Sequence, residues 1–453
     1  MLTVRIQGLA WLVVAIGAGA HAGAAQEAQS AAPDWDWGAR LGEYLTNETG
    51  GKWAIEFEQR ERYENHTAPN FGQDPDRFTG LARTRVGVIW KPLGWLKISG
   101  MMQDSRAPWY GNHAPNTVRD PFGLHEGYIE ARSEEKTGFG FSGGRRMLNY
   151  GEGRVIGTPQ WSNLSRTYDQ GRLWFATSRA RFEALLVSPV KINVNSFSQP
   201  NLGDRVWGMY NSFPDVFKSS LLEVYLLRHD QNRSGGFTGG SRAAGTDRLR
   251  VNACGSRLAG PLAGGWRYNL EGMVQNGMVG TGHHKAEAWL SWVGRRSSIA
   301  GHDFDASVEY KFASGSRNPA DPALSRTYDQ FYPPNHDKFG HEDLLGWRNL
   351  HNLRSLETFA VTKAFALNFM YDQFWLASAR DGLYNSSGKI IAQSISGAAG
   401  QHVGQEADLF GTYNFSHFTF GAGYGYFAPG RFLQKTTPGI SPTYVYVFHA
   451  YTF

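Results

Sequence analysis

Charged side chains recur at every second position of residues 54–66, in the stretch AIEFEQRERYENH. Glu56, Glu58, Arg60 and Arg62 share one parity, and the other parity begins with isoleucine and phenylalanine. Successive side chains of a β-strand point to opposite faces, so an extended chain lines up carboxylates and guanidinium groups on one face. Guanidinium groups hold carboxylates through paired N–H donors, so this row could attract and bind anions.

The same alternation of polar and apolar residues recurs along much of the chain. It is seen at residues 81–90, 266–275 and 303–312, and no long stretch shows the 3.6-residue period of an amphipathic helix. In a soluble sandwich the apolar parity would face the core and the polar parity would face water. Aromatic residues near the strand ends instead favour strands that cross a bilayer, because aromatic rims lie at lipid interfaces.

The connections between the expected strands alternate between short turns and long loops. Residues 91–94 form a tight turn, whereas residues 313–349 form the longest loop. This alternation, with about eighteen strands, predicts an all-β fold: a transmembrane antiparallel β-barrel with short periplasmic turns and long extracellular loops. A barrel of this size encloses an aqueous channel. We expect the loop at 313–349 to lie outside the cell and partly cover the pore.

The two ends of the chain agree with export to the outer membrane. Arg5 precedes a short apolar run, followed by small residues suited to signal-peptidase cleavage. The run is shorter than the ~20 residues of a spanning helix, which disfavours an N-terminal membrane anchor. We expect a signal peptide at 1–25, a periplasmic lead-in at 26–50 and an outer-membrane β-barrel at 51–453. The terminal Phe453 resembles the signature by which bacterial outer-membrane barrels are recognised for insertion.

Composition bounds the chemistry and the partners. The single cysteine, Cys254, excludes an internal disulfide, and its parity is expected to face the lumen. The net charge of +5 is mild, and an exported chain has little access to nucleic acid, so outer-membrane lipid and a translocated solute are the expected partners. His283 and His284 lie in a short connection without a third ligand, so no metal site and no cofactor are expected.

Longer stretches resemble a known family. FEQRERYEN, LARTRVGV and residues 143–172, which contain GRR, YGEGRVIG and YDQGR, are similar to the alginate-export family of eighteen-stranded porins. The resemblance covers most of the mature chain. It implies an arginine-rich constriction and loops that fold over or into the pore, and it leaves room for periplasmic export partners. Arg145 and Arg154 lie in its densest part and are expected to reach the pore from a strand end or a loop.

The candidate pore-lining and substrate-binding residues are arginines and glutamates on parities that we expect to face the lumen. Besides Arg145 and Arg154, they are Arg60, Arg62, Arg83, Arg85, Arg132, Arg146, Arg172, Arg248, Arg250, Glu56, Glu58 and Glu130. The alternative is that each arginine pairs with a neighbouring carboxylate and stiffens the wall. Rings of arginine make a pore anion-selective, whereas interleaved acids also suit a neutral or zwitterionic solute.

These features predict an outer-membrane channel for an anionic or saccharide-type solute, a class that includes uronate-containing polysaccharides such as alginate. The alternative is an outer-membrane barrel enzyme, a hydrolase with its active site at the rim. GFSGG fits the G-x-S-x-G pattern around Ser142, but it lies in a predicted strand with no helix after it. No convincing serine, histidine and acid set is evident, so we expect a channel and not an enzyme.

Overall fold

The computed structural model describes residues 36–453 except 116, 135–136, 195, 218, 233–247 and 337. The predicted signal peptide at 1–25 lies outside the described residues. The described part of the predicted lead-in contains a helix, α1 (Trp37–Glu48), which the alternating pattern did not indicate. The Asp36 carboxylate caps this helix by accepting the Ala39 N–H at 3.2 Å. Among the described helices, none is long and apolar enough to cross a membrane.

Eighteen strands form one closed antiparallel barrel, as predicted. In chain order they are β1 (Trp53–Thr67), β2 (Arg77–Leu93), β3 (Leu96–Arg106), β4 (Asp120–Arg132), β5 (Gly138–Arg146), β6 (Tyr168–Ala176), β7 (Arg181–Lys191), β9 (Asp204–Phe217), β10 (Ser220–Gln231), β11 (Leu249–Pro261), β12 (Trp266–Val279), β13 (Gly282–Ile299), β14 (His302–Ala313), β16 (Leu350–Ala360), β17 (Phe365–Leu376), β20 (His402–Phe415), β21 (Phe418–Pro429) and β22 (Thr443–Thr452). Each strand pairs with its neighbours along the chain, and β22 pairs with β1 to close the ring. Closure leaves no unpaired sheet edge for lipid to cover.

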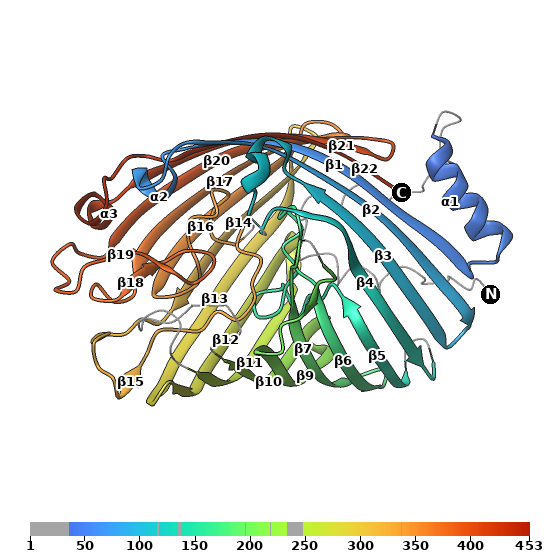
Figure 1. Ribbon diagram of the computed structural model, residues 1–453, viewed down its shortest axis with the longest axis horizontal. Helices are drawn as coiled ribbons and strands as arrows, with labels where there is room; N and C mark the ends of the chain where they lie inside the picture. The colour runs from blue at the N-terminus through green and yellow to red at the C-terminus, as the bar shows by residue number, and fades with distance from the viewer. Residues whose placement is uncertain are drawn as a thin grey trace.

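The remaining elements are short and belong to the connections. They are β8 (Gln199–Pro200), β15 (Leu324–Ser325), β18 (Gly382–Tyr384), β19 (Ile390–Gln393), α2 (Pro69–Gly72), α3 (Arg431–Thr436) and the 3₁₀ turns η1 (Pro108–His113) and η3 (Ala263–Gly265). In Figure 1 the barrel strands run side by side around the molecule, and α1 lies beside the C-terminus. Loop segments cross the space that the strands enclose.

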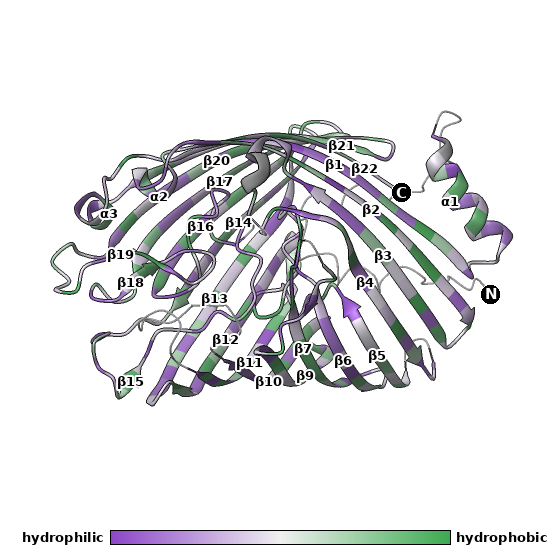
Figure 2. Cartoon of the chain, in the orientation of Figure 1, coloured by the Kyte–Doolittle hydropathy of each residue, from purple (hydrophilic) through white to green (hydrophobic). Residues whose placement is uncertain are grey.

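The outer face of the wall is apolar and rich in aromatic residues. Figure 2 shows hydrophobic and hydrophilic residues alternating along the strands. On β2 the outward side chains include Val86, Val88 and Trp90, which are all exposed. Trp90 stacks on Trp53 of β1 with ring centroids 5.4 Å apart, at the end of the strands that carries the short turn to β3. These positions fit a face that meets lipid, with aromatic rings at its border.

Two connections fold into the barrel and carry much of its buried core. They are the segment between β5 and β6, residues 147–167, and the segment between β14 and β16, residues 314–349. Ile156 of the first and Tyr332 of the second form a β-bridge. Both side chains belong to a buried apolar cluster that also includes inward-facing wall residues such as Val251 and Met273. The second loop was expected outside the cell, partly covering the pore; its buried part lies within the barrel, where its aromatic residues pack on apolar side chains of the wall.

The inserted loops overturn the predicted facing of β11. On this strand Leu249 and Val251 are buried in the cluster with the loops, whereas Arg250 and Cys254 are exposed, as is Arg248 just before the strand. The strand register places Cys254 beside the exposed Leu226 of β10, on the outer face. The expectation that Arg248, Arg250 and Cys254 face the lumen is therefore wrong. The prediction assigned the apolar parity to the lipid face, but on β11 the apolar side chains pack on the loops inserted into the barrel.

Candidate functional site

Four arginines of β1 and β2 form a compact basic surface inside the barrel, which we call the arginine wall: Arg60, Arg62, Arg83 and Arg85. The two strands are hydrogen-bonded neighbours, and Arg60 is the direct register partner of Arg83. All four side chains are buried, with at most 7 % of any residue exposed. The alternation that places them on one face is local, so the sequence pattern was sufficient to group them.

The arginine wall holds the backbone of the first inserted loop. Arg60 donates to the Gln160, Trp161 and Ser162 carbonyl oxygens at 2.9, 3.0 and 3.2 Å. Arg83 donates to the first and third of these at 3.1 and 2.8 Å, and Arg62 to the second at 2.5 Å. Three consecutive carbonyl groups thus lie where the oxygens of a carboxylate could lie, because each is an acceptor directed at guanidinium N–H groups.

Glutamates neutralise part of the arginine wall. Glu58 lies 2.6 Å from Arg83 and 3.3 Å from Arg85, and Glu64 lies 2.6 Å from Arg62. The wall-bracing alternative therefore holds for these three arginines. Arg60 differs, since its hydrogen bonds described above go to loop carbonyl groups. The four guanidinium groups thus share two directly paired carboxylates. Glu56 lies on the same parity of β1, partly exposed, beside Gly87 of β2.

Two other predicted arginines also pair with carboxylates on the lumenal parity. Arg146 at the end of β5 contacts Glu130 of β4 at 2.7 Å. Arg172 of β6 contacts Glu183 of β7 at 3.4 Å. The structure thus brings these residues together in pairs along the wall, separately from the arginine wall on β1 and β2. Contact between any of them and a solute stays a prediction.

The residues expected from the densest part of the resemblance lie in different environments. Arg154 lies in the first inserted loop, buried, and is paired with Glu309 of β14. Arg145 lies on the opposite face of β5 from Ser142 and Arg146, and contacts Asp169 through two hydrogen bonds of 2.8 and 2.9 Å. Arg145 is buried and also donates to the Ser198 carbonyl oxygen at 2.8 Å, and its approach to the pore stays a prediction.

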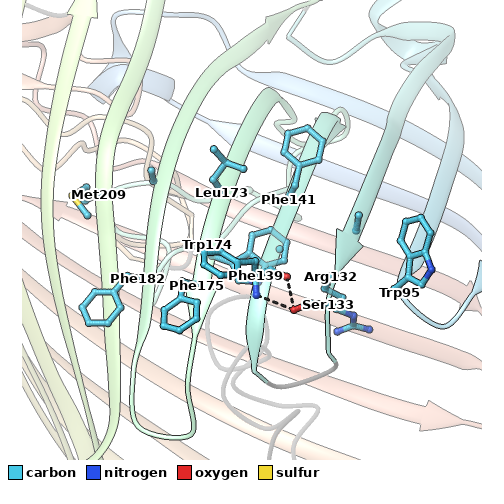
Figure 3. Close-up of a pocket in the computed structure, with 13 residues that line it drawn as sticks. Trp95, Arg132, Ser133, Phe139, Phe141, Leu173, Trp174, Phe175, Phe182 and Met209 are labelled. Atoms are coloured by element: carbon cyan, nitrogen blue, oxygen red, sulfur yellow. Dashed lines mark hydrogen bonds between the residues drawn. The ribbon is translucent and has the colours of Figure 1, made fainter.

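Arg132 lies at the end of β4, next to a groove on the outer face. The groove has a volume of about 740 Å³ and is lined mainly by apolar side chains, among them Phe139, Leu173 and Phe182 (Figure 3). At its edge the Ser133 hydroxyl accepts the Phe139 N–H at 2.9 Å. The lining faces the side of the wall that meets lipid, so we assign the groove to the membrane surface and not to the solute path.

Sequence patterns missed the residues that hold the second inserted loop. His229 of β10 lies between two carboxylates, with Nδ1 2.6 Å from Asp329 of the loop and Nε2 2.8 Å from Asp204 of β9. Arg348 contacts the same Asp329 at 2.8 Å. This buried network fixes the loop to the wall, because each charged group has an opposite charge within hydrogen-bonding distance. Loop residues have no alternating pattern, so no local signal identified them.

A buried acidic cluster lies at a second contact between this loop and the wall. Glu342 of the loop meets Glu406 and Asp408 of β20, and the Glu342 N–H donates to the Glu406 carboxylate at 3.0 Å. Burial and the neighbouring Glu406 carboxylate raise the pKa of Glu342 well above its usual range. Within the described residues, no group of three or more His, Cys, Asp or Glu side chains is arranged to hold a metal ion.

Comparison with known proteins identifies the family. The family model for alginate export matches residues 53–447. The chain belongs to the alginate export family. No curated protein sequence matches it. The match runs from the start of β1 through the first half of β22.

Solved outer-membrane porins share the fold of this alginate export family member. Pseudomonas aeruginosa OccK2 (OpdF) aligns with a TM-score of 0.59 at 10% sequence identity, over 88% of this chain and 97% of that one. A BenF-like porin from Pseudomonas fluorescens Pf-5 aligns with a TM-score of 0.59 at 9% identity, over 88% of this chain and 98% of that one. Family and fold together place the chain in the bacterial outer membrane as a channel-type β-barrel.

Proposed function

We propose that this protein carries sugar acids or similar organic anions across the outer membrane, and that the arginine wall is where their carboxylates bind. The observation that carries the proposal is the set of guanidinium groups of Arg60, Arg62 and Arg83 that converge on three consecutive carbonyl oxygens. Such a surface selects oxygen acceptors, and it attracts negative charge.

The comparison with OccK2 supports this class of solute. A structure of OccK2 (OpdF) in complex with glucuronate aligns with this chain at a TM-score of 0.60 and 10% identity, over 88% of this chain and 98% of that one. Glucuronate is a cyclic sugar acid, the monomeric counterpart of a uronate polymer. The match with alginate export over residues 53–447 is in keeping with a uronate solute. Glu58 and Glu64, paired within the wall, make the expected preference modest and not absolute.

No enzymatic activity forms part of the proposal. Ser142, the serine of the GFSGG stretch, lies within β5 and accepts a hydrogen bond from Gln170 at 3.0 Å. A channel of this family and fold needs no catalytic group, and the purified protein is expected to hydrolyse neither lipid nor peptide substrates. Export partners in the periplasm stay a prediction, carried by the family relationship.

The test is a reversal-potential measurement in planar bilayers under a salt gradient. The Arg60→Ser, Arg83→Ser double variant removes two lumenal charges and should shift the reversal potential towards cations, most strongly at low salt, where screening is weak. The Arg248→Ser, Arg250→Ser double variant is the matched control, because it removes the same charge from the outer side. Equal shifts in both variants, or no shift in either, would overturn the assignment of the arginine wall to the solute path.

A further inference from the structure

Aromatic rings of β22 lie over glycines of β21 on the lumenal face, directly beside the arginine wall. Tyr446 is the register partner of Gly423, and Phe448 is the partner of Gly421. A Cβ atom at Gly421 would fall 2.2 Å from the Phe448 ring, and one at Gly423 would fall 2.4 Å from the Tyr446 ring. The absence of side chains on β21 therefore lets both rings lie across it. On its other side β22 pairs with β1, where Phe448 is the partner of Arg62.

Trp161 of the first inserted loop rests on this surface. Its ring centroid is 4.8 Å from that of Tyr446 and 5.6 Å from that of Phe448, at interplanar angles of 69° and 87°. The Arg62 guanidinium lies 4.0 Å from the same indole, and the indole N–H donates to the Tyr444 hydroxyl at 3.2 Å. The side chain of Trp161 thus fills an aromatic recess, while its carbonyl oxygen accepts from the arginine wall.

The loop segment around Trp161 therefore combines a ring with oxygen acceptors, as a cyclic sugar acid does. It presents a flat ring to the aromatic surface and carbonyl oxygens to the guanidinium groups. The C–H face of a pyranose ring packs on aromatic rings, which supply apolar contact area and a polarisable face. A carboxylate on that ring would reach the guanidinium groups that now hold the loop. The two features adjoin each other, because the ring is the Trp161 side chain and the carbonyl oxygens belong to Trp161 and its two neighbours in the chain.

We propose that Tyr446 and Phe448, with Arg62 beside them, form a subsite for the pyranose ring of the translocated solute, and that Trp161 is a tethered occupant that the solute displaces. The inference rests on the proposed function, because it places a ring-specific subsite next to the carboxylate-binding arginines. Tyr446 is only 5 % exposed with Trp161 in place, so the subsite opens when the loop moves away. Trp161 also stacks on His336 of the second loop, with centroids 4.6 Å apart, so displacement of Trp161 loosens both loops.

The experiment compares ring and open-chain solutes of equal charge. Block of single-channel current is titrated with glucuronate against gluconate, and with glucose against sorbitol, in the full-length protein reconstituted in bilayers. The wild-type channel should bind the ring member of each pair more tightly. Tyr446→Leu, Phe448→Leu should reduce that ratio about two- to tenfold, which is the worth of one or two aromatic contacts. Trp161→Ala should raise the ratio, because it empties the subsite. Tyr424→Leu, on the outer parity of β21, is the matched control.

The outcomes separate this inference from the proposed function. A wild-type channel that shows no anion preference but binds glucose more tightly than sorbitol would overturn the carboxylate assignment and keep the ring subsite. An anion-selective channel with no ring preference in either pair would overturn the ring subsite alone. A Trp161→Ala variant with reduced ring preference would show that Trp161 itself is the stacking surface, which overturns its role as occupant. Folding of each variant is checked by its heat-modifiable migration in gels, and the single Phe448→Leu variant, which still removes one ring, provides a milder replacement if the double variant does not fold.

Discussion

At the residue scale, charged side chains that line the lumen form ion pairs with one another and hydrogen bonds to the inserted loops. Arg62, Arg83 and Arg85 have carboxylate partners, as wall bracing requires, yet they still donate to the inserted loop. His229 bridges the loop and the wall between two carboxylates. Buried ion pairs contribute little net stability but are costly to break one partner at a time. Such contacts therefore decide which conformation the loops adopt more than how stable the barrel is.

Glu342 makes loop docking sensitive to pH. Its folded-state pKa is raised from the usual 4.5 by burial and by Glu406, so its contribution to docking is fully present below about pH 4.5 and is lost as pH rises through the raised value. Channel conductance should therefore increase as the pH rises through the raised pKa of Glu342, because the second loop then leaves the wall. The Glu342→Gln variant should flatten the profile, measured as single-channel conductance from pH 4 to 9. A variant that keeps the wild-type slope would show that another group controls docking.

At the element scale, the two inserted loops act as part of the core. Their apolar residues pack on inward side chains of the strands, and Ile156 pairs with Tyr332 between the loops. The wall is held by a continuous ladder of strand pairs, and neither loop contributes to the ring of eighteen strands. The loops thus occupy part of the lumen and take no part in the strand ring, so their removal should change conductance more than it changes barrel formation.

Replacement of residues 317–346 by a short Gly-Ser linker should enlarge the conductance several-fold while the barrel still forms, since its strand pairs remain. The variant should also unfold at a lower temperature, because wall residues such as Val251 and Met273 lose their buried contacts, each at a cost of about 1–3 kcal/mol. Single-channel recording and thermal gel migration test both expectations. Unchanged conductance would mean that the first loop alone sets the constriction.

At the scale of the whole molecule, the first described residues meet the C-terminal residues where the barrel closes. The backbone of Phe453 exchanges hydrogen bonds of 2.9 and 3.1 Å with Phe57 of β1, and the two rings stack at 5.4 Å. The helix α1 packs on the same ring through Gly38 and Gly42, where added Cβ atoms would lie 3.1 and 3.3 Å from Phe453. The Tyr451 hydroxyl also donates to Asp36, the residue that caps α1. The N-terminal helix thus covers the seam between the first and last strands.

The Gly42→Leu variant should displace α1 from this seam, because a large side chain does not fit against the Phe453 ring. The expected loss is about 1–3 kcal/mol, the cost of overpacking a close contact, and the barrel should keep its conductance, since β1 still pairs with β22. Thermal unfolding measures this loss of stability. Gly50→Leu is not a suitable control, because Gly50 has a positive φ of 60°. Thr46→Leu, at an exposed position of α1, is the control. A midpoint equal to wild type would show that the helix contributes nothing at the seam.

The sequence by itself determined the features that depend on local alternation. Period-two patterning, the order of short and long connections and the terminal aromatic residue were sufficient to predict an antiparallel barrel of about eighteen strands. They also placed Arg60, Arg62, Arg83 and Arg85 on one inward face, because the two strands are neighbours and each parity is a property of its own strand.

Only the tertiary structure decided which apolar faces meet lipid and which meet protein. Leu249 and Val251 look the same in either setting, so Arg248, Arg250 and Cys254 were assigned to the wrong side. The contacts of Trp161, His229 and Glu342 join segments far apart in the chain, and their loops carry no periodic signal. Alternation reports that two faces of a strand differ, whereas the identity of the apolar partner, lipid or an inserted loop, depends on where the rest of the chain folds.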